Sequence, residues 1–206
     1  MPQELPSIHH RVIIGIDPGT TVTGYGIISC EGKRMELLAC GAIQLGKSGD
    51  PHPERLSKIF RRVQGLVREF KATEMALEAP FFGKNPQSML KLGRAQGVAM
   101  AAGLSEGLEI FEYAPRKVKM AVTGNGSASK DMVAGMLRTL LKFEETPKFL
   151  DATDGLAVAV CHFFQGRATQ TGPKANNWQA FLKQNPDRVK RRPTPKRNPP
   201  SKDSLT

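Results

Sequence analysis

Four acidic residues stand at places where carboxylates could bind metal ions. Asp17 ends an apolar run in RVIIGIDPGTT and is followed at once by a Pro-Gly turn. Glu78 ends a second apolar run in TEMALEAPFF, and Asp151 and Asp154 open the apolar stretch DATDGLAVAV. Singly, each has an ordinary interpretation, because acids are common in turns, at strand ends and at helix N-termini. Together, in apolar surroundings, they would be costly without a cation beside them.

The ligand chemistry favours Mg²⁺ or Mn²⁺ as that cation. Carboxylate oxygens suit these hard ions. The three cysteines have no CxxC spacing, so they indicate neither a zinc site nor a disulfide framework. Two such ions together activate a water and stabilise the leaving oxygen when a phosphodiester is hydrolysed. A two-metal hydrolase is therefore one hypothesis, beside a simple hairpin turn or a phosphate-binding loop at Asp17.

In a two-metal site, each acid has an expected role. Asp17 is expected to contact both Mg²⁺ ions, Glu78 to hold one, and Asp151 with Asp154 to hold the other. Crowded carboxylates repel one another, so some are expected to bind protons until metal enters. Activity is then expected to fall at acidic pH.

The patterns along the chain predict an α/β domain that brings these acids together. Apolar, β-branched runs joined by Gly-containing turns predict three antiparallel strands, and later strands alternate with amphipathic helices. A mixed sheet of five strands with helices on both faces follows. The expected strands are 12–17, 22–29, 34–44, 73–78 and 108–113, and the expected helices are 53–70, 86–104, 115–122 and two that begin near Ser129 and Asp151.

This topology determines whether the acids can meet. If the first and fourth strands are neighbours, Asp17 and Glu78 emerge side by side at one edge of the sheet. Asp151 and Asp154, three residues apart, share one face of the last helix.

Charge and composition divide the chain in two. Residues 1–166 are long enough for one domain with a real core, which is expected to be catalytic. Residues 167–206 are rich in Pro, Lys and Arg and carry +8 of the net charge of +11. We interpret them as a basic, mostly disordered tail that either solubilises the protein or contacts a polyanion.

The same composition predicts a cytoplasmic protein. The chain lacks a signal-peptide pattern and any apolar run of about 18 residues.

Four segments of the chain resemble the RuvC family of Holliday-junction endonucleases in order and spacing. They are GIDPGTTVTGYGII, EAPFFGKNPQSMLKLGRAQGVAM, FEYAPRKVKMAVTGNGSASKDMV and DATDGLAVAVCHF. The resemblance implies an RNase H-like fold and a homodimer that cuts two symmetry-related strands of a four-way DNA junction, leaving 5′-phosphate and 3′-hydroxyl ends. It places the family's metal ligands on Asp17, Glu78, Asp151 and Asp154, and it implies the branch-migration proteins RuvA and RuvB as partners in recombination and repair.

Several further residues are candidates for DNA contact. Lys130 begins a helix, where a cation is unfavourable against the helix dipole unless an anion shares the site. The resemblance places phosphate-contacting lysines at Lys119 and Lys130, and it favours Phe81 over Phe82 as the ring that stacks on an opened junction. Two more basic residues near Glu78, Lys84 and Arg94, are weaker candidates for backbone contact.

Other classes of protein remain open from the residues alone. GIDPGTT also resembles the first phosphate-binding turn of the actin, Hsp70 and sugar-kinase ATPases, although those need a duplicated domain and a second Gly-rich hairpin. A junction-binding module without catalysis is a third hypothesis, expected to lack one or more of the four acids. Small residues on the helix from Pro86 permit close approach of a second copy.

Overall fold

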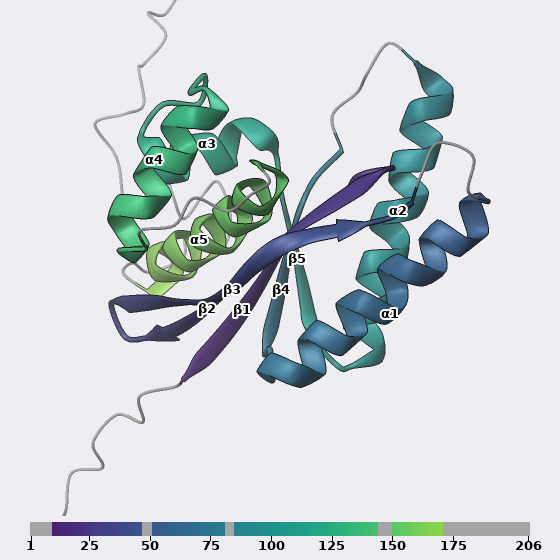
Figure 1. Cartoon of the computed structure of the whole chain (residues 1–206). Coiled ribbons are helices and arrows are strands. Elements are labelled where there is room, and N and C mark those ends of the chain that lie inside the picture. The colour runs from purple at the N-terminus through teal and green to yellow at the C-terminus, as the bar shows by residue number, and fades with distance from the viewer. Residues whose placement is uncertain (1–9, 47–50, 81–84, 144–149, 171–206) are drawn as a thin grey trace, which may run out of the picture. The chain divides into compact units, whose positions relative to one another are not determined.

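The computed structural model describes residues 10–46, 51–80, 85–143 and 150–170, the last four of these by backbone alone. The chain divides into two units, Met1–Ala168 and Thr169–Thr206. A five-stranded sheet of order β3-β2-β1-β4-β5 forms the centre of the first unit (Figure 1). The strands are β1 (Arg11–Asp17), β2 (Val22–Glu31), β3 (Arg34–Gln44), β4 (Glu74–Glu78) and β5 (Glu109–Tyr113).

The predicted mixed sheet is confirmed. β1, β2 and β3 pair antiparallel, whereas β4 pairs parallel to both β1 and β5. The first and fourth strands are therefore neighbours, which is the condition for Asp17 and Glu78 to meet.

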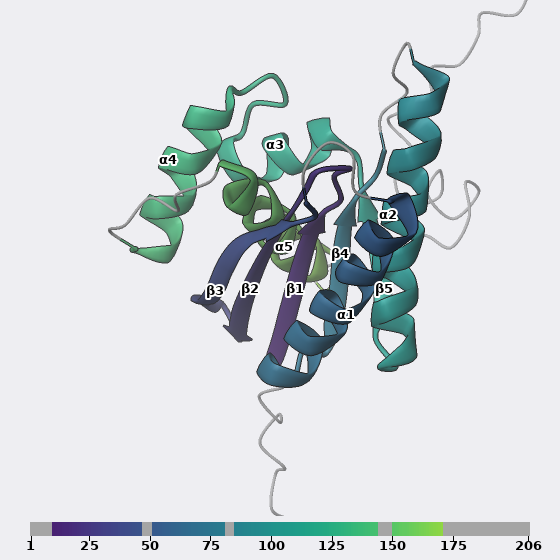
Figure 2. The ribbon, with the colours of Figure 1, turned by 45° about the vertical axis from the view of Figure 1, so that its right-hand side comes forward.

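Helices cover both faces of the sheet (Figures 1 and 2). One face packs against α1 and α2, and the other against α3, α4 and α5, each through its own apolar core. The helices are α1 (His52–Phe70), α2 (Pro86–Ser105), α3 (Pro115–Thr123), α4 (Lys130–Leu141) and α5 (Leu150–Gln170). α5 thus continues past residue 166, where the sequence predicts the domain to end. None of the helices in the described part of the chain is long and apolar enough to cross a bilayer.

Strand alternation determines which side chains face α5. Ile13 on β1 and Ala76 on β4 belong to the core beneath α5, whereas Ile14 and Met75 belong to the opposite core. Side chains alternate with a period of two along a strand, so every second residue of β1 and of β4 faces α5. The residues at both ends of this face are polar. Asp17 and Glu78 stand at its carboxyl edge, and Arg11 and Glu74 at its amino edge.

α5 lies directly on the backbone of the sheet because glycines stand beneath it. A Cβ on Gly15 would lie 2.3 Å from the Gly155 carbonyl oxygen, and one on Gly26 would lie 2.3 Å from the Leu156 Cα. A Cβ on Gly155 itself would lie 2.6 Å from the Tyr25 Cα. Any side chain in this contact would push the helix away from the sheet.

Substituting Gly155 by Ala is expected to destabilise the protein by about 3 kcal/mol, because the new methyl group meets backbone that cannot yield. Gly65→Ala is the matched control: Gly65 also lies inside a helix, but its added Cβ meets nothing within 4 Å. That variant is expected to be more stable than wild type by about 0.5 to 1 kcal/mol. Urea denaturation of both variants measures the difference, and equal effects would contradict the close contact.

Candidate active site

The two strand-end acids stand side by side at the carboxyl edge of the sheet. Asp17 is the last residue of β1 and Glu78 the last residue of β4. The register pairs Ile16 with Leu77, so the next residue of each strand lies at the same level. Both face α5, as the alternation of side chains requires.

The N-terminal turn of α5 brings the other two acids to the same edge. Gly24 pairs with Asp17 across β1 and β2, and a Cβ on Gly24 would lie 1.8 Å from the Asp151 carbonyl oxygen. The first turn of α5 therefore lies over the strand beside Asp17. Asp151 and Asp154 are both half-buried there.

Three of the four acids line one pocket of about 220 Å³. Asp17, Glu78 and Asp154 contribute carboxylates to it, and Lys119 and Lys130 contribute ammonium groups. Lys130 Nζ donates a hydrogen bond to Asp154 Oδ2 at 2.5 Å. Asp151 does not line this pocket, but its charge raises the pKa values of both Asp17 and Lys130.

Burial and mutual repulsion raise the pKa values of the two strand-end acids. Burial is the main cause for Glu78, followed by the charges of Asp17 and Asp154, and together they raise its pKa to about 7. Burial and then the charge of Asp154 raise the pKa of Asp17 to about 6. Lys130 lowers both pKa values, and its hydrogen bond to Asp154 raises its own pKa.

These observations fit a site for hard divalent cations. The donors are carboxylate oxygens, and burial together with mutual repulsion raises the pKa values of Asp17 and Glu78, so a nearby cation would stabilise their ionised forms. The carboxylates do not form a ready-made cage, because no three His, Cys, Asp or Glu side chains within the described ranges are placed to hold an ion together. The ion pair between Lys130 and Asp154 is one reason, since it gives that carboxylate a cation already.

Raising the pH from about 5 to about 8 is expected to destabilise the metal-free wild type relative to a Glu78→Gln variant. The folded-state pKa of Glu78, about 7, lies above its ordinary value of 4.5, so the folded state binds more protons than the unfolded state between these values. Ionisation therefore opposes folding as the pH rises through this window. Denaturation in EDTA at several pH values measures it, and a pH-independent difference in unfolding free energy would contradict the shift.

A second pocket, of about 180 Å³, adjoins the same two strand-end acids. It is lined by Asp17 and Glu78 together with Leu92, Gln96 and Pro115, among other residues. Gln96 is buried and its Nε2 donates to Glu112 Oε1 at 2.5 Å. The sequence gives no signal for Gln96, because α2 carries other polar residues and the pattern does not show which of them is buried.

Of the remaining predicted contact residues, the structure describes Arg94 alone. Arg94 is exposed on α2 and lines neither of the two pockets. Phe81, Phe82 and Lys84 lie outside the described residues, so their roles stay predictions.

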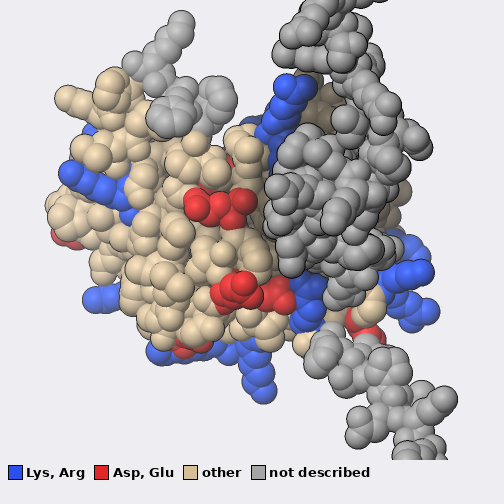
Figure 3. Space-filling view, turned by 180° about the vertical axis from the view of Figure 1, so that it is seen from behind, with Lys and Arg blue, Asp and Glu red and all other residues tan. Residues whose placement is uncertain are grey.

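The surface seen from behind has no continuous basic patch where described residues are visible (Figure 3). Lys and Arg lie mainly around its edge, and Asp and Glu form small separate groups. This distribution agrees with the small net charge of residues 1–166.

Sequence comparisons give one consistent family. A model of the family described as crossover junction endodeoxyribonuclease RuvC matches residues 13–162. A protein of that description from Cytophaga hutchinsonii is 54% identical over 185 residues, with 90% of this chain and 91% of the relative covered. One from Porphyromonas gingivalis is 55% identical, with 87% of this chain and 97% of the relative covered.

Solved structures agree with this. The structure of Thermus thermophilus RuvC in complex with Holliday junction substrate matches with a TM-score of 0.73 at 33% identity, covering 78% of this chain and 97% of that one. The yeast mitochondrial Holliday junction resolvase Ydc2 shares the fold, with a TM-score of 0.58 at 15% identity over 84% of this chain and 83% of that one. The chain therefore belongs to the RuvC family, the crossover junction endodeoxyribonucleases, and is a hydrolase of that class.

Proposed function

We propose that this chain resolves Holliday junctions by Mg²⁺-dependent incision, with Asp17, Glu78, Asp151 and Asp154 as the ligands of two ions. The observation that carries the proposal is the meeting of acids from β1, β4 and α5 beside two lysines in one pocket. Its donor chemistry suits Mg²⁺, and Mn²⁺ is expected to substitute. When bound, the two ions would activate the attacking water and stabilise the leaving 3′-oxygen.

The chain's own residues then have distinct tasks. Asp17, between Glu78 on β4 and the two acids of α5, would contact both ions, whereas Glu78 and the α5 acids would each serve one. Burial of Asp17 and Glu78 removes water that would otherwise screen their charges. Cleavage is therefore expected to fall at acidic pH, because protons and ions compete for the same oxygens.

The two lysines of the pocket are proposed to hold the scissile strand. Lys130 contacts Asp154 in the absence of ligands, and a phosphate in the pocket offers its ammonium group another anionic partner. Lys119 lines the same pocket, and its positive charge lowers the pKa of Glu78. Binding of the phosphate by Lys130 would release Asp154 toward the cation.

A homodimer is proposed to place two such sites on one junction. Gly93 and Gly97 are exposed on α2, and an added Cβ on either would meet nothing within 4 Å. Leu90 and Leu104, both 59% exposed, extend the same helix surface. Small residues between exposed leucines favour close approach of a second α2, and twofold symmetry then allows paired incisions with 5′-phosphate and 3′-hydroxyl ends.

Two parts of the proposal, the partners and the cellular role, rest on the family resemblance alone, whereas the location also rests on the composition of the chain. RuvA and RuvB are the expected branch-migration partners, and the cytoplasm is the expected location. The expected role is in homologous recombination and DNA repair.

Incision of a cruciform extruded from a supercoiled plasmid tests the proposed function. Paired cutting by a dimer gives a linear product, whereas independent single nicks give an open circle. We expect linear product that requires Mg²⁺ or Mn²⁺ and no ATP hydrolysis. ATP turnover without incision would support the ATPase hypothesis, and junction binding without incision would support the non-catalytic module.

A further inference from the structure

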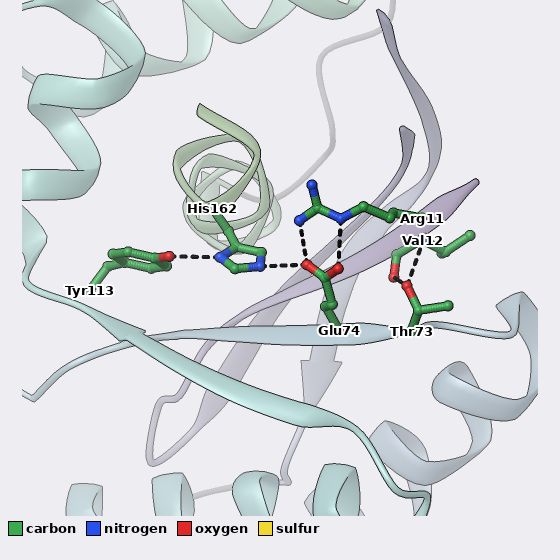
Figure 4. A network of polar contacts seen from close by, with 6 residues as sticks. All are labelled: Arg11, Val12, Thr73, Glu74, Tyr113 and His162. Atoms are coloured by element: carbon green, nitrogen blue, oxygen red, sulfur yellow. Dashed lines mark hydrogen bonds and ion pairs between the residues drawn. The ribbon is translucent and has the colours of Figure 1, made fainter. Parts of the chain in front are cut away.

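A partly buried chain of polar side chains crosses the face of the sheet beneath α5, at the end opposite the four acids (Figure 4). Arg11 donates through Nε and Nη2 to the two carboxylate oxygens of Glu74. His162 Nε2 lies 2.7 Å from Glu74 Oε2, and His162 Nδ1 lies 2.6 Å from the Tyr113 hydroxyl. The chain therefore ties α5 to β1, β4 and β5 at once.

The orientation of these hydrogen bonds follows from the partners. The pKa of Glu74 is lowered to about 2 by its hydrogen bonds with His162 and Arg11, although burial opposes the shift, so its carboxylate accepts. Burial raises the pKa of Tyr113 to about 12, so its phenol keeps the proton to donate. One imidazole tautomer satisfies both contacts, with Nε2–H donating to Glu74 and Nδ1 accepting from Tyr113.

Between this polar chain and the four acids, glycines of the sheet lie beneath α5 in place of side chains that would interlock with the helix. Helices normally fix their position on a partner by side chains that interlock. Here backbone meets backbone, because Gly15, Gly24 and Gly26 of the sheet lie under Gly155 and its neighbours. This contact allows α5 to approach closely, and it leaves the apolar side chains of the core, Leu156 and Phe163 among them, together with the polar chain to fix the position of the helix along the strands.

We propose that His162 is a positioning residue. Through its contacts with Tyr113 and with the Arg11–Glu74 pair, it fixes the position of α5 over the glycines of β1 and β2. His162 and Asp151 are eleven residues apart, close to three full helical turns, so both lie on the sheet-facing side of α5. A shift of the helix at His162 is therefore transmitted along a rigid element to Asp151 and Asp154. This inference rests on the proposed metal-binding function of those two acids.

Mn²⁺ binding without DNA, followed by electron paramagnetic resonance, tests the proposal on the full chain. His162→Leu keeps an apolar side chain of similar bulk but removes both hydrogen bonds, and it is expected to weaken Mn²⁺ binding about tenfold. His162→Gln retains a donor toward Glu74 and is expected to restore most of the affinity. The Mn²⁺ concentration for half-maximal junction incision is expected to change in parallel.

A matched variant separates positioning from loss of stability. Val160 is fully buried in α5 but does not belong to the polar chain, so Val160→Ala is expected to lower the melting temperature and leave the Mn²⁺ affinity unchanged. If His162→Leu fails to fold, Tyr113→Phe removes one hydrogen bond of the chain and is expected to weaken Mn²⁺ binding as well.

The outcomes distinguish this inference from the proposed function. Wild-type Mn²⁺ affinity in both His162→Leu and Tyr113→Phe would overturn the positioning role while leaving the metal site intact. Equal weakening by Val160→Ala would also overturn it, because any destabilisation of α5 would then suffice. Failure of the wild type itself to bind Mn²⁺ would overturn the proposed function and the inference with it.

Discussion

Replacing Asp17 with Asn is expected to reduce junction incision by at least about 10³-fold while junction binding is retained. Asn has the same shape but carries no charge, so the variant loses a carboxylate whose charge interacts with those of Glu78, Asp151 and Asp154. Binding is expected to stay equal or become tighter, because one anion that repels phosphate is removed. Gel-shift binding in Ca²⁺ and cleavage in Mg²⁺ measure the two effects separately.

Loss of folding is not the cause of the expected loss of incision by Asp17→Asn. Burial of the ionised Asp17 carboxyl opposes folding, since its pKa is raised to about 6, so the Asn variant is expected to be no less stable than wild type at neutral pH without metal. Glu109→Gln is the matched control, an exposed acid at the amino end of β5. It is expected to cut at the wild-type rate. Full activity of Asp17→Asn would remove the metal site from the mechanism.

Replacing Lys130 with Met is expected to change incision and metal binding in opposite directions. Incision is expected to fall about 10²-fold, because the variant lacks a cation for the phosphate as charge develops on it. Without DNA, Mn²⁺ is expected to bind a few-fold more tightly, since the ammonium group no longer occupies Asp154 or repels the incoming ion.

The opposed signs make this result specific to Lys130. A lysine that only stabilises the fold would weaken both properties, and a lysine outside the site would change neither. Lys33→Met, at an exposed lysine in the turn between β2 and β3, is the matched control. Weaker Mn²⁺ binding by Lys130→Met would contradict the ion-pair exchange with Asp154.

The sequence was sufficient to predict which acids stand at the ends of strands. Apolar runs that end in Asp17 and Glu78 predicted two strand ends, and the structure confirms that β1 and β4 are parallel neighbours. The position of both acids on the α5 face follows from strand alternation alone. The order of strands across the sheet was harder, because it depends on contacts that no local pattern encodes.

Other features of the site depend on distant partners and could not be predicted from the sequence. His162 packs against Phe111, but its two hydrogen-bond partners lie 49 and 88 residues away along the chain. The Lys130–Asp154 ion pair likewise joins two helices. The alternating glycines 24 and 26 were a visible signal, since glycine inside a strand often marks close backbone approach.

The most direct measurement is a crystal structure of the protein soaked with Mn²⁺, with data collected at an X-ray energy where manganese scatters anomalously. Anomalous peaks are expected within about 2.2 Å of carboxylate oxygens of Asp17 and of at least two of Glu78, Asp151 and Asp154. Lys130 is then expected to have left Asp154. Manganese bound elsewhere, with these four carboxylates still free of it at saturating concentration, would contradict the account.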